Sequence, residues 1–190
     1  DNPIGLDNPH PRFSWILESE DRDVRQQAYR IVVKTDEETL WDTGRVEKDS
    51  SVLIPYEGKP FSPCSAYLVQ VQVWDNKGNT DWREAGFETG LLSGTAFQAD
   101  WITHGFPKEE TACPVFFKDF LLPEKKRKEI AAVRIYATAL GMYEIRLNGV
   151  KAGDTFFAPG WTNYRKRLQY QAYEIKAELR ENNRLEIIVG

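Results

Sequence analysis

The sequence has little of what the commonest catalytic and metal sites require. It holds 2 cysteines and 2 histidines in 190 residues. Neither His10 nor His104 has the paired spacing of a metal site. The sequence has no Gly-rich phosphate loop, no Gly-x-Ser-x-Gly motif and no Cys/His cluster. These absences leave nucleophilic mechanisms based on Ser or Cys without support.

The two cysteines say little about the cellular compartment. Cys64 and Cys113 lie in different halves of the chain. They allow one disulfide, but two free thiols fit better because the spacing shows no disulfide framework. The compartment therefore stays open between periplasmic or secreted and cytoplasmic.

Long apolar runs and charge of one sign are absent as well. No run approaches the ~20 residues of a membrane-spanning helix. The net charge is −4 with acids and bases interleaved, whereas a nucleic-acid-binding face needs clustered basic residues. The one basic run, residues 125–128, is predicted to be a solvated loop. The sequence thus predicts neither a membrane span nor a nucleic-acid partner.

Aromatic residues and alternating patterns are what the sequence does have. It holds 6 Trp, 8 Tyr and 10 Phe, whose broad rings suit the space between packed sheets. Apolar and polar residues alternate in short runs between turn residues, which is typical of antiparallel sandwiches and predicts an all-β fold. The expected strands are residues 12–17, 28–35, 39–46, 50–54, 66–75 and 82–88, then 115–122, 132–137, 143–147, 167–173 and 185–189.

These strands divide into two units. Residues 1–92 are predicted to form a fibronectin type III or immunoglobulin-like sandwich, with Tyr67 at the start of the longest strand, near where such folds place a tyrosine. Residues 93–98 are the expected linker. Residues 99–190 form the second unit, which ends on the alternating residues Leu185, Ile187 and Val189. We expect that unit to be incomplete and the chain to be part of something longer; the alternative is a terminal edge strand.

The most informative stretch is residues 140–173. Tyr143, Ile145 and Leu147 alternate with polar residues, and Asn148-Gly149 follows at once. Both of these turn residues tolerate positive φ, which predicts a two-residue hairpin. The return segment leads to residues 158–164 (APGWTNY), a turn with two large aromatics. A hairpin that feeds an aromatic-rich loop suits a sugar-facing surface, although spacing alone does not establish one.

Several motifs, in this order, resemble the N-terminal region of bacterial α-L-rhamnosidases of glycoside hydrolase family 78. In the first unit they are residues 2–7 (NPIGLD), 11–15 (PRFSW), 40–46 (LWDTGRV), 73–75 (VWD) and 87–91 (FETGL). In the second unit they are residues 99–102 (ADWI), 147–149 (LNG), 153–154 (GD) and 158–164. The resemblance covers essentially the whole chain, and the order of the motifs is more specific than any one of them.

The resemblance implies a multidomain enzyme that hydrolyses terminal α-L-rhamnose with inversion. It implies β-sandwich modules first, the second of jelly-roll type, followed by an (α/α)6 barrel. Inversion requires a general acid and a general base about 6.5–9.5 Å apart, and in this family both belong to the barrel. We therefore expect no catalytic residues in this chain. The expected partners are the missing C-terminal catalytic domain and a rhamnose-containing glycan or glycoside.

The candidates for carbohydrate binding are Asp154, Trp161, Asn163 and Tyr164. The Trp161 and Tyr164 rings could stack on the apolar face of a sugar. We nevertheless favour a Trp161 that plugs the sandwich edge, because buried Trp is common in such folds. The resemblance adds calcium, since some family members bind rhamnose in the jelly-roll domain with a calcium ion. Asp154 and Asn148 are its candidate ligands, with Asn163 as a further oxygen donor.

Three functions stay open at this point. The chain is the accessory region of an α-L-rhamnosidase, giving structural support and binding sugar. Alternatively, it is a stand-alone carbohydrate-binding module, whose sugar binding would weaken when Trp161 is removed. A third interpretation is a structural or interaction module, which would expose an apolar face where other domains dock.

Overall fold

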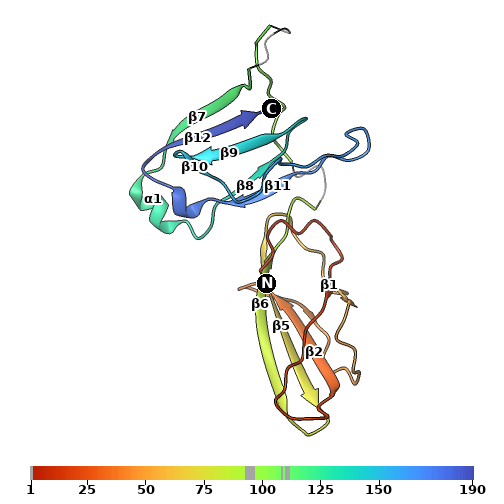
Figure 1. The fold of residues 1–190 in the computed structure, drawn as a ribbon. Coiled ribbons are helices and arrows are strands. Elements are labelled where there is room, and N and C mark those ends of the chain that lie inside the picture. The colour runs from red at the N-terminus through yellow and green to blue at the C-terminus, as the bar shows by residue number, and fades with distance from the viewer. Residues whose placement is uncertain (1, 93–96, 108, 110–111) are drawn as a thin grey trace. The chain divides into compact units, whose positions relative to one another are not determined.

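The computed structural model of this chain describes residues 2–92, 97–107, 109 and 112–190. The chain divides into two compact units, Asp1–Ala99 and Asp100–Gly190. Each unit has its own hydrophobic core. The secondary structure is almost entirely strands, which confirms the predicted all-β fold (Figure 1). The predicted linker at 93–98 has residues 93–96 outside the described residues. No helix in the described part is long and apolar enough to cross a membrane.

The first unit is built around a four-stranded antiparallel sheet in the order β3-β2-β5-β6. A two-stranded pair, β1 with β4, contributes Phe13 and Ile54 to the core. The strands are β1 (Arg12–Phe13), β2 (Gln26–Lys34), β3 (Thr39–Asp42), β4 (Ile54–Pro55), β5 (Ala66–Asp75) and β6 (Thr80–Glu88).

Two of the predicted strands in this unit are much shorter than expected. The run at 12–17 pairs only at Arg12 and Phe13, and the run at 50–54 pairs only at Ile54, with Pro55 as the second residue of that strand. Leu53 has a φ of 55°, which is outside the extended region and stops the ladder. Ile16 on the other side is 87% exposed, so alternation alone overestimated both strands.

The core of the first unit follows the predicted alternation. Tyr29, Ile31 and Val33 of β2 are buried, and the rings around them pack closely, with Tyr56 and Phe61 stacked at 4.3 Å. Trp82 does not join this core: it lies on the opposite face of the sheet and is 56% exposed.

Tyr67 identifies the type of sandwich. Its side chain is buried at the start of β5. Its hydroxyl accepts a hydrogen bond of 2.8 Å from the backbone N–H of Ser62, five residues upstream. A tyrosine near the start of a strand that bonds back to the preceding backbone is the tyrosine corner of immunoglobulin-like folds. The first unit is therefore an immunoglobulin-like sandwich.

The second unit has a four-stranded antiparallel sheet in the order β10-β9-β12-β7 and a two-stranded sheet of β11 and β8. Buried residues of both sheets, Ile145 and Tyr173 among them, form one core. The elements are β7 (Val115–Leu121), α1 (Glu124–Glu129), β8 (Arg134–Ala137), β9 (Tyr143–Leu147), β10 (Val150–Lys151), β11 (Gln171–Glu174), a 3₁₀ turn (Lys176–Glu178) and β12 (Asn182–Val189).

The last strand, β12, is an interior strand. It pairs with β7 on one side and with β9 on the other, as Figure 1 shows. Leu185 and Ile187 lie directly opposite Leu147 and Ile145, which places their apolar side chains on the core face. The alternative of a terminal edge strand is therefore wrong.

The basic run at residues 125–128 is helical rather than a loop. It lies in α1, which begins directly after Pro123 and has no buried residue. Lys and Arg are good helix formers, and Lys128 pairs with Glu124 one turn earlier at 2.8 Å. The run is solvated, as predicted, but the prediction of a loop overlooked its helix propensity.

Candidate carbohydrate-binding surface

The hairpin of β9 and β10 forms the base of the candidate site. Asn148 and Gly149 both have positive φ, 54° and 82°, and Leu147 pairs with Val150 across them. This confirms the predicted two-residue turn, whose twist matches that of the flanking strands. The segment after β10, residues 152–170, leads to β11 and reaches beyond the strands of this unit (Figure 1).

Asn148 has a structural role. Its amide N–H₂ donates to the carbonyl of Glu178 at 2.7 Å and to Oδ1 of Asn183 at 3.1 Å. Its Oδ1 accepts from the backbone N–H of Arg184 at 2.9 Å. These bonds tie the hairpin turn to β12. The oxygen expected to bind calcium is thus already engaged.

The other calcium candidates do not gather around Asn148. Asp154 is exposed and makes no hydrogen bond or ion pair with another described residue, and Oδ1 of Asn163 accepts from the N–H of Arg165 at 3.1 Å. Among the described residues, no group of three or more His, Cys, Asp or Glu side chains could hold a metal ion. Calcium binding stays a prediction that depends on Asp154.

The loop after β10 is anchored by two buried residues. Ala158 and Pro159 are buried, and a cis peptide bond joins them. The carbonyl of Ala158 accepts from Tyr143 N–H at 2.8 Å, and the carbonyl of Pro159 accepts from the amide of Gln171 at 3.1 Å. The loop is therefore fixed to β9 and β11 immediately before its aromatic residues.

Trp161 is the most exposed large apolar residue of the described chain, with a fractional exposure of 91%. Our interpretation that it plugs the sandwich edge is wrong. Ala158 and Pro159 are buried at that position instead. The backbone then turns at Gly160, whose φ of 101° only glycine adopts readily. Trp161 follows this turn and lies in solvent.

Tyr164 is held close to Trp161. Their ring centroids are 6.2 Å apart at an interplanar angle of 42°. The Tyr164 hydroxyl accepts from the N–H of Gly141 at 3.2 Å. The structure thus brings together two of the four predicted sugar-binding side chains, with Asn163 in the same turn. It shows no contact between Asp154 and either ring.

The turn that carries these residues is closed by local hydrogen bonds. The carbonyl of Asn163 accepts from the N–H groups of Lys166 and Arg167 at 2.8 and 2.9 Å. The Thr162 hydroxyl donates to the carbonyl of Arg167 at 2.6 Å. These bonds hold Arg167 in the turn, and β11 begins only at Gln171. The strand predicted at 167–173 therefore starts four residues later than expected.

Phe156 and Phe157 are exposed residues that the sequence analysis missed. Each is 75% exposed, and Nζ of Lys151 lies 3.6 Å from the Phe156 ring centroid. Residues 156–157 lie outside the strands of this unit, so no alternating pattern in the sequence could assign either ring to a face. We call residues 154–167, with Phe156, Phe157, Trp161 and Tyr164, the aromatic loop.

Glu144, the carboxylate of the β9–β10 hairpin, forms ion pairs with basic side chains of the same hairpin. Glu144 on β9 accepts a hydrogen bond of 2.8 Å from Nε of Arg146, and Nζ of Lys151 lies 3.7 Å from it. The hydrogen bond from Arg146 is the main cause that lowers the pKa of Glu144. A carboxylate held ionised in this way is unsuited to act as a general acid.

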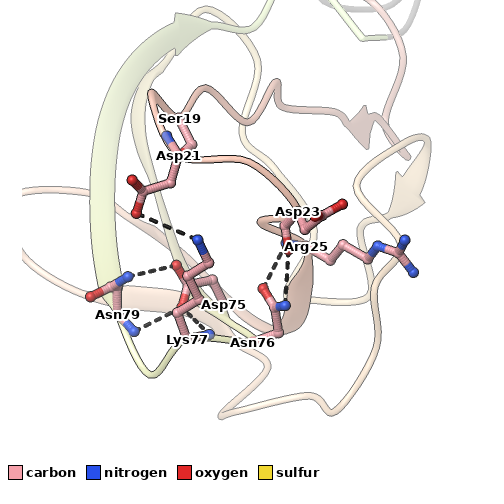
Figure 2. Close-up of polar contacts among 8 residues, drawn as sticks. All are labelled: Ser19, Asp21, Asp23, Arg25, Asp75, Asn76, Lys77 and Asn79. Atoms are coloured by element: carbon pink, nitrogen blue, oxygen red, sulfur yellow. Dashed lines mark hydrogen bonds and ion pairs between the residues drawn. The ribbon is translucent and has the colours of Figure 1, made fainter.

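A polar cluster lies at the β5–β6 turn of the first unit, beside a hollow whose lining includes Asp21, Asp23 and Asp75. Figure 2 shows the hydrogen bonds and the ion pair within this cluster. Oδ1 of Asp75 accepts from the N–H groups of Lys77 and Asn79, both at 2.8 Å. Asn76 bonds to the backbone of Arg25 and Asp23. The side-chain bond from Asn79 is the main cause that lowers the pKa of Asp75. These carboxylate and amide groups shape the turn between β5 and β6.

The fold and this surface define a class of protein region. Two β-sandwich units stand in tandem: the first is immunoglobulin-like, and the second carries exposed rings on an anchored loop. An exposed group of apolar rings on an anchored loop marks an interaction surface, so this is a tandem β-sandwich region with a binding face.

The comparisons with known proteins then identify the family. Residues 1–93 match the family model described as Rha78A-like, N-terminal immunoglobulin domain. Residues 128–190 match the model described as alpha-L-rhamnosidase N-terminal domain. The chain therefore belongs to the α-L-rhamnosidase family and corresponds to its N-terminal region.

Individual relatives agree with this assignment. An alpha-L-rhamnosidase of Formosa agariphila is 32% identical over 217 residues, which cover 100% of this chain and 23% of that protein. The solved alpha-L-rhamnosidase of Dictyoglumus thermophilum has a TM-score of 0.85 and 32% identity, covering 100% of this chain and 24% of its own. The solved alpha-L-rhamnosidase of Aspergillus terreus has a TM-score of 0.84 and 30% identity, and the match covers 100% of this chain and 22% of that protein. The chain thus spans less than a quarter of these relatives.

Proposed function

We propose that this chain is the N-terminal accessory region of an α-L-rhamnosidase that removes terminal α-L-rhamnose from glycans or glycosides by inversion. In that protein it supports the catalytic domain, and its aromatic loop binds the rhamnose-containing glycan. The observation that supports the sugar-binding role is Trp161, a 91% exposed ring on a loop anchored to two strands.

The chemistry of rhamnose fits this loop. Its pyranose ring has an apolar C–H face, and a methyl group replaces the hydroxymethyl group of common hexoses. An exposed indole offers a flat apolar surface of matching size together with one N–H donor. The loop is tied to β9 and β11 before the ligand arrives, so little conformational entropy is lost on binding. Tyr164 and Asn163 stand beside the indole and offer polar groups for hydroxyls.

Calorimetric titration of the chain with L-rhamnose and with a rhamnogalacturonan oligosaccharide tests this proposal. We expect saturable binding that Trp161→Ala weakens by about tenfold, equivalent to ~1.4 kcal/mol. Trp101→Ala is the matched control, because Trp101 is 64% exposed in the same unit but lies outside the aromatic loop. Equal affinities of the wild type and the Trp161 variant, or no binding by the wild type, would overturn the sugar-binding role.

A second candidate function is docking alone. On β7, alternate residues Val115, Phe117 and Leu121 are 51%, 64% and 63% exposed and share one face of the edge strand. An exposed apolar stripe of this kind favours contact with another domain. If docking is the only role, Phe117→Ser leaves the isolated chain folded but weakens its association with the catalytic region, and neither sugar binds.

A further inference from the structure

The outer face of the first unit's sheet contains a hollow that the proposed function does not use. This is the face opposite the aromatic core. The hollow has a volume of about 300 Å³, at the lower end of small-ligand sites. It crosses the sheet from β3 to β6. Its principal lining residues are Arg30, Val32, Asp42, Gln70, Gln72 and Trp82.

Trp82 forms one wall of this hollow. It lies on β6 directly opposite Gln72 of β5, and the residue is 56% exposed. A single exposed aromatic residue needs no explanation on a protein surface. This ring, however, borders a hollow whose other walls carry amides and charged groups. An aromatic face beside fixed polar groups is the combination that a sugar ring requires, because a pyranose has one apolar face and a rim of hydroxyls.

The two glutamines are oriented and keep hydrogen-bonding capacity. The Gln70 amide donates to Glu84 at 2.7 Å, and the Gln72 amide donates to the Thr80 hydroxyl at 3.2 Å. Each bond uses one N–H of the side chain. A carboxamide has a second N–H and a carbonyl oxygen with two lone pairs. Both glutamines can therefore donate to and accept from hydroxyl groups placed over the hollow.

The charges around the hollow indicate a neutral ligand. Nε of Arg30 donates to Oδ1 of Asp42 at 2.8 Å, and Nη2 bonds the other carboxylate oxygen. Lys34 pairs with Glu84 at 3.5 Å. Each cation is thus matched by an anion. An acidic sugar would need to displace a carboxylate from a bidentate pair, which is among the stronger polar contacts of proteins.

We propose that this face of the β3-β2-β5-β6 sheet is a second carbohydrate-binding site that takes a neutral oligosaccharide. One pyranose ring stacks on Trp82, and its hydroxyls bond to Gln70 and Gln72. The site lies on the immunoglobulin-like unit and shares no residue with the aromatic loop. It gives the region a second glycan contact besides the proposed one at Trp161, and only that shared role depends on the proposed function.

Indole N–H resonances of the ¹⁵N-labelled chain provide the test. The Trp82 signal is assigned from its absence in Trp82→Phe. The probes are neutral xylo-, cello- and rhamno-oligosaccharides, added separately. We expect at least one probe to move the Trp82 signal in a saturable way, and Gln72→Ala to weaken that binding by about tenfold. Trp161→Ala leaves the Trp82 titration unchanged, which separates this site from the aromatic loop.

Two results would overturn the site. The first is a Trp82 signal that no neutral oligosaccharide moves while the folded spectrum is intact. The second is a Trp82 signal that shifts with protein concentration in the absence of sugar, which would make this face an interface between copies of the chain. Gln72→Asn serves as the conservative variant because it keeps the amide. A spectrum of Gln72→Ala that matches the wild type outside the hollow shows that its loss of binding is not a folding defect.

Discussion

At the scale of single residues, the environment of a side chain depends on its neighbours as much as on its type. Trp161 is of a residue type that is mostly buried in folded proteins. Here, however, Ala158 and Pro159 are the buried residues of the loop, and the backbone turns at Gly160 before Trp161. Tyr143 and Tyr173 show the reverse. Both carry a hydroxyl, and both are buried, because each hydroxyl finds a partner within the core.

The pair of buried hydroxyls leads to a first prediction. The Tyr143 hydroxyl donates to the carbonyl of Ala137 at 2.9 Å. The Tyr173 hydroxyl in turn donates to the Tyr143 hydroxyl at 3.2 Å. Tyr143→Phe removes the hydrogen bond to Ala137 and leaves the buried Tyr173 hydroxyl without its acceptor, so we expect a loss of about 1–2 kcal/mol in the free energy of unfolding. Urea unfolding measures it. A double-mutant cycle with Tyr173→Phe is the control, and strictly additive losses would show that the hydroxyls do not interact.

Tyr56 makes stability depend on pH in the alkaline range. Burial raises the pKa of Tyr56 to about 12, whereas an unfolded tyrosine ionises near pH ~10. The folded state therefore holds this proton more tightly. Its contribution to stability is complete below pH ~10 and is lost as the pH rises toward the folded pKa.

We expect the wild type to lose free energy of unfolding more steeply than Tyr56→Phe over that interval. Phenylalanine cannot ionise, and the rest of the chain titrates identically in both proteins. Urea unfolding at several pH values on either side of ~10 supplies the two curves. Parallel curves would show that Tyr56 ionises as easily in the folded state as in the unfolded chain.

At the scale of elements, period and turn chemistry decide where long strands and tight hairpins form. β2 and β5 follow the predicted runs closely, because alternation over nine or ten residues fixes both the period and the buried face. The short strands β1 and β4 differ from their predicted runs, because a two-residue pairing depends on which segment the fold places beside it. Their length cannot be read from local alternation.

The Asn148-Gly149 turn gives a prediction at this scale. Gly149 has a φ of 82°, and an added Cβ would meet no atom within 4 Å. Gly149→Ala therefore changes only the backbone preference, and we expect it to cost about 1–2 kcal/mol of stability. Gly105→Ala is the matched control, since Gly105 also has open space around it but lies outside the left-handed region. Thermal unfolding of both variants should separate them by several degrees; similar melting temperatures would show that the turn tolerates alanine.

At the scale of the whole molecule, the chain spans 23% of the length of its Formosa agariphila relative. Its two units have separate cores, and the exposed rings of Phe156, Phe157 and Trp161 lie on a loop outside these cores. The proposed function assigns this region to holding the glycan and assigns hydrolysis to the remainder of the polypeptide. Substrate size should then decide how much the N-terminal region matters.

This division of roles predicts a dependence on substrate size. In an α-L-rhamnosidase polypeptide that carries this region, we expect Trp161→Ala to raise KM several-fold for a rhamnose-containing polysaccharide and to leave an aryl α-L-rhamnoside unaffected. The small substrate reaches only the catalytic centre, whereas the polymer also contacts the accessory region. Steady-state kinetics on both substrates provide the measurement. An equal loss of kcat on both would instead assign Trp161 to the support of the catalytic domain.

The sequence by itself determined the all-β fold, the core faces of β2, β5 and β9, the hairpin at Asn148-Gly149 and the family. These features depend on local alternation, on turn chemistry and on the order of motifs, all of which lie within short stretches of chain. Tertiary structure alone decided that β12 is an interior strand, that Trp161 and Trp82 are exposed and that Asn148 is engaged in hydrogen bonds. Each of these depends on which segment, distant in the sequence, packs beside the residue in the folded chain. The local sequence does not specify that neighbour.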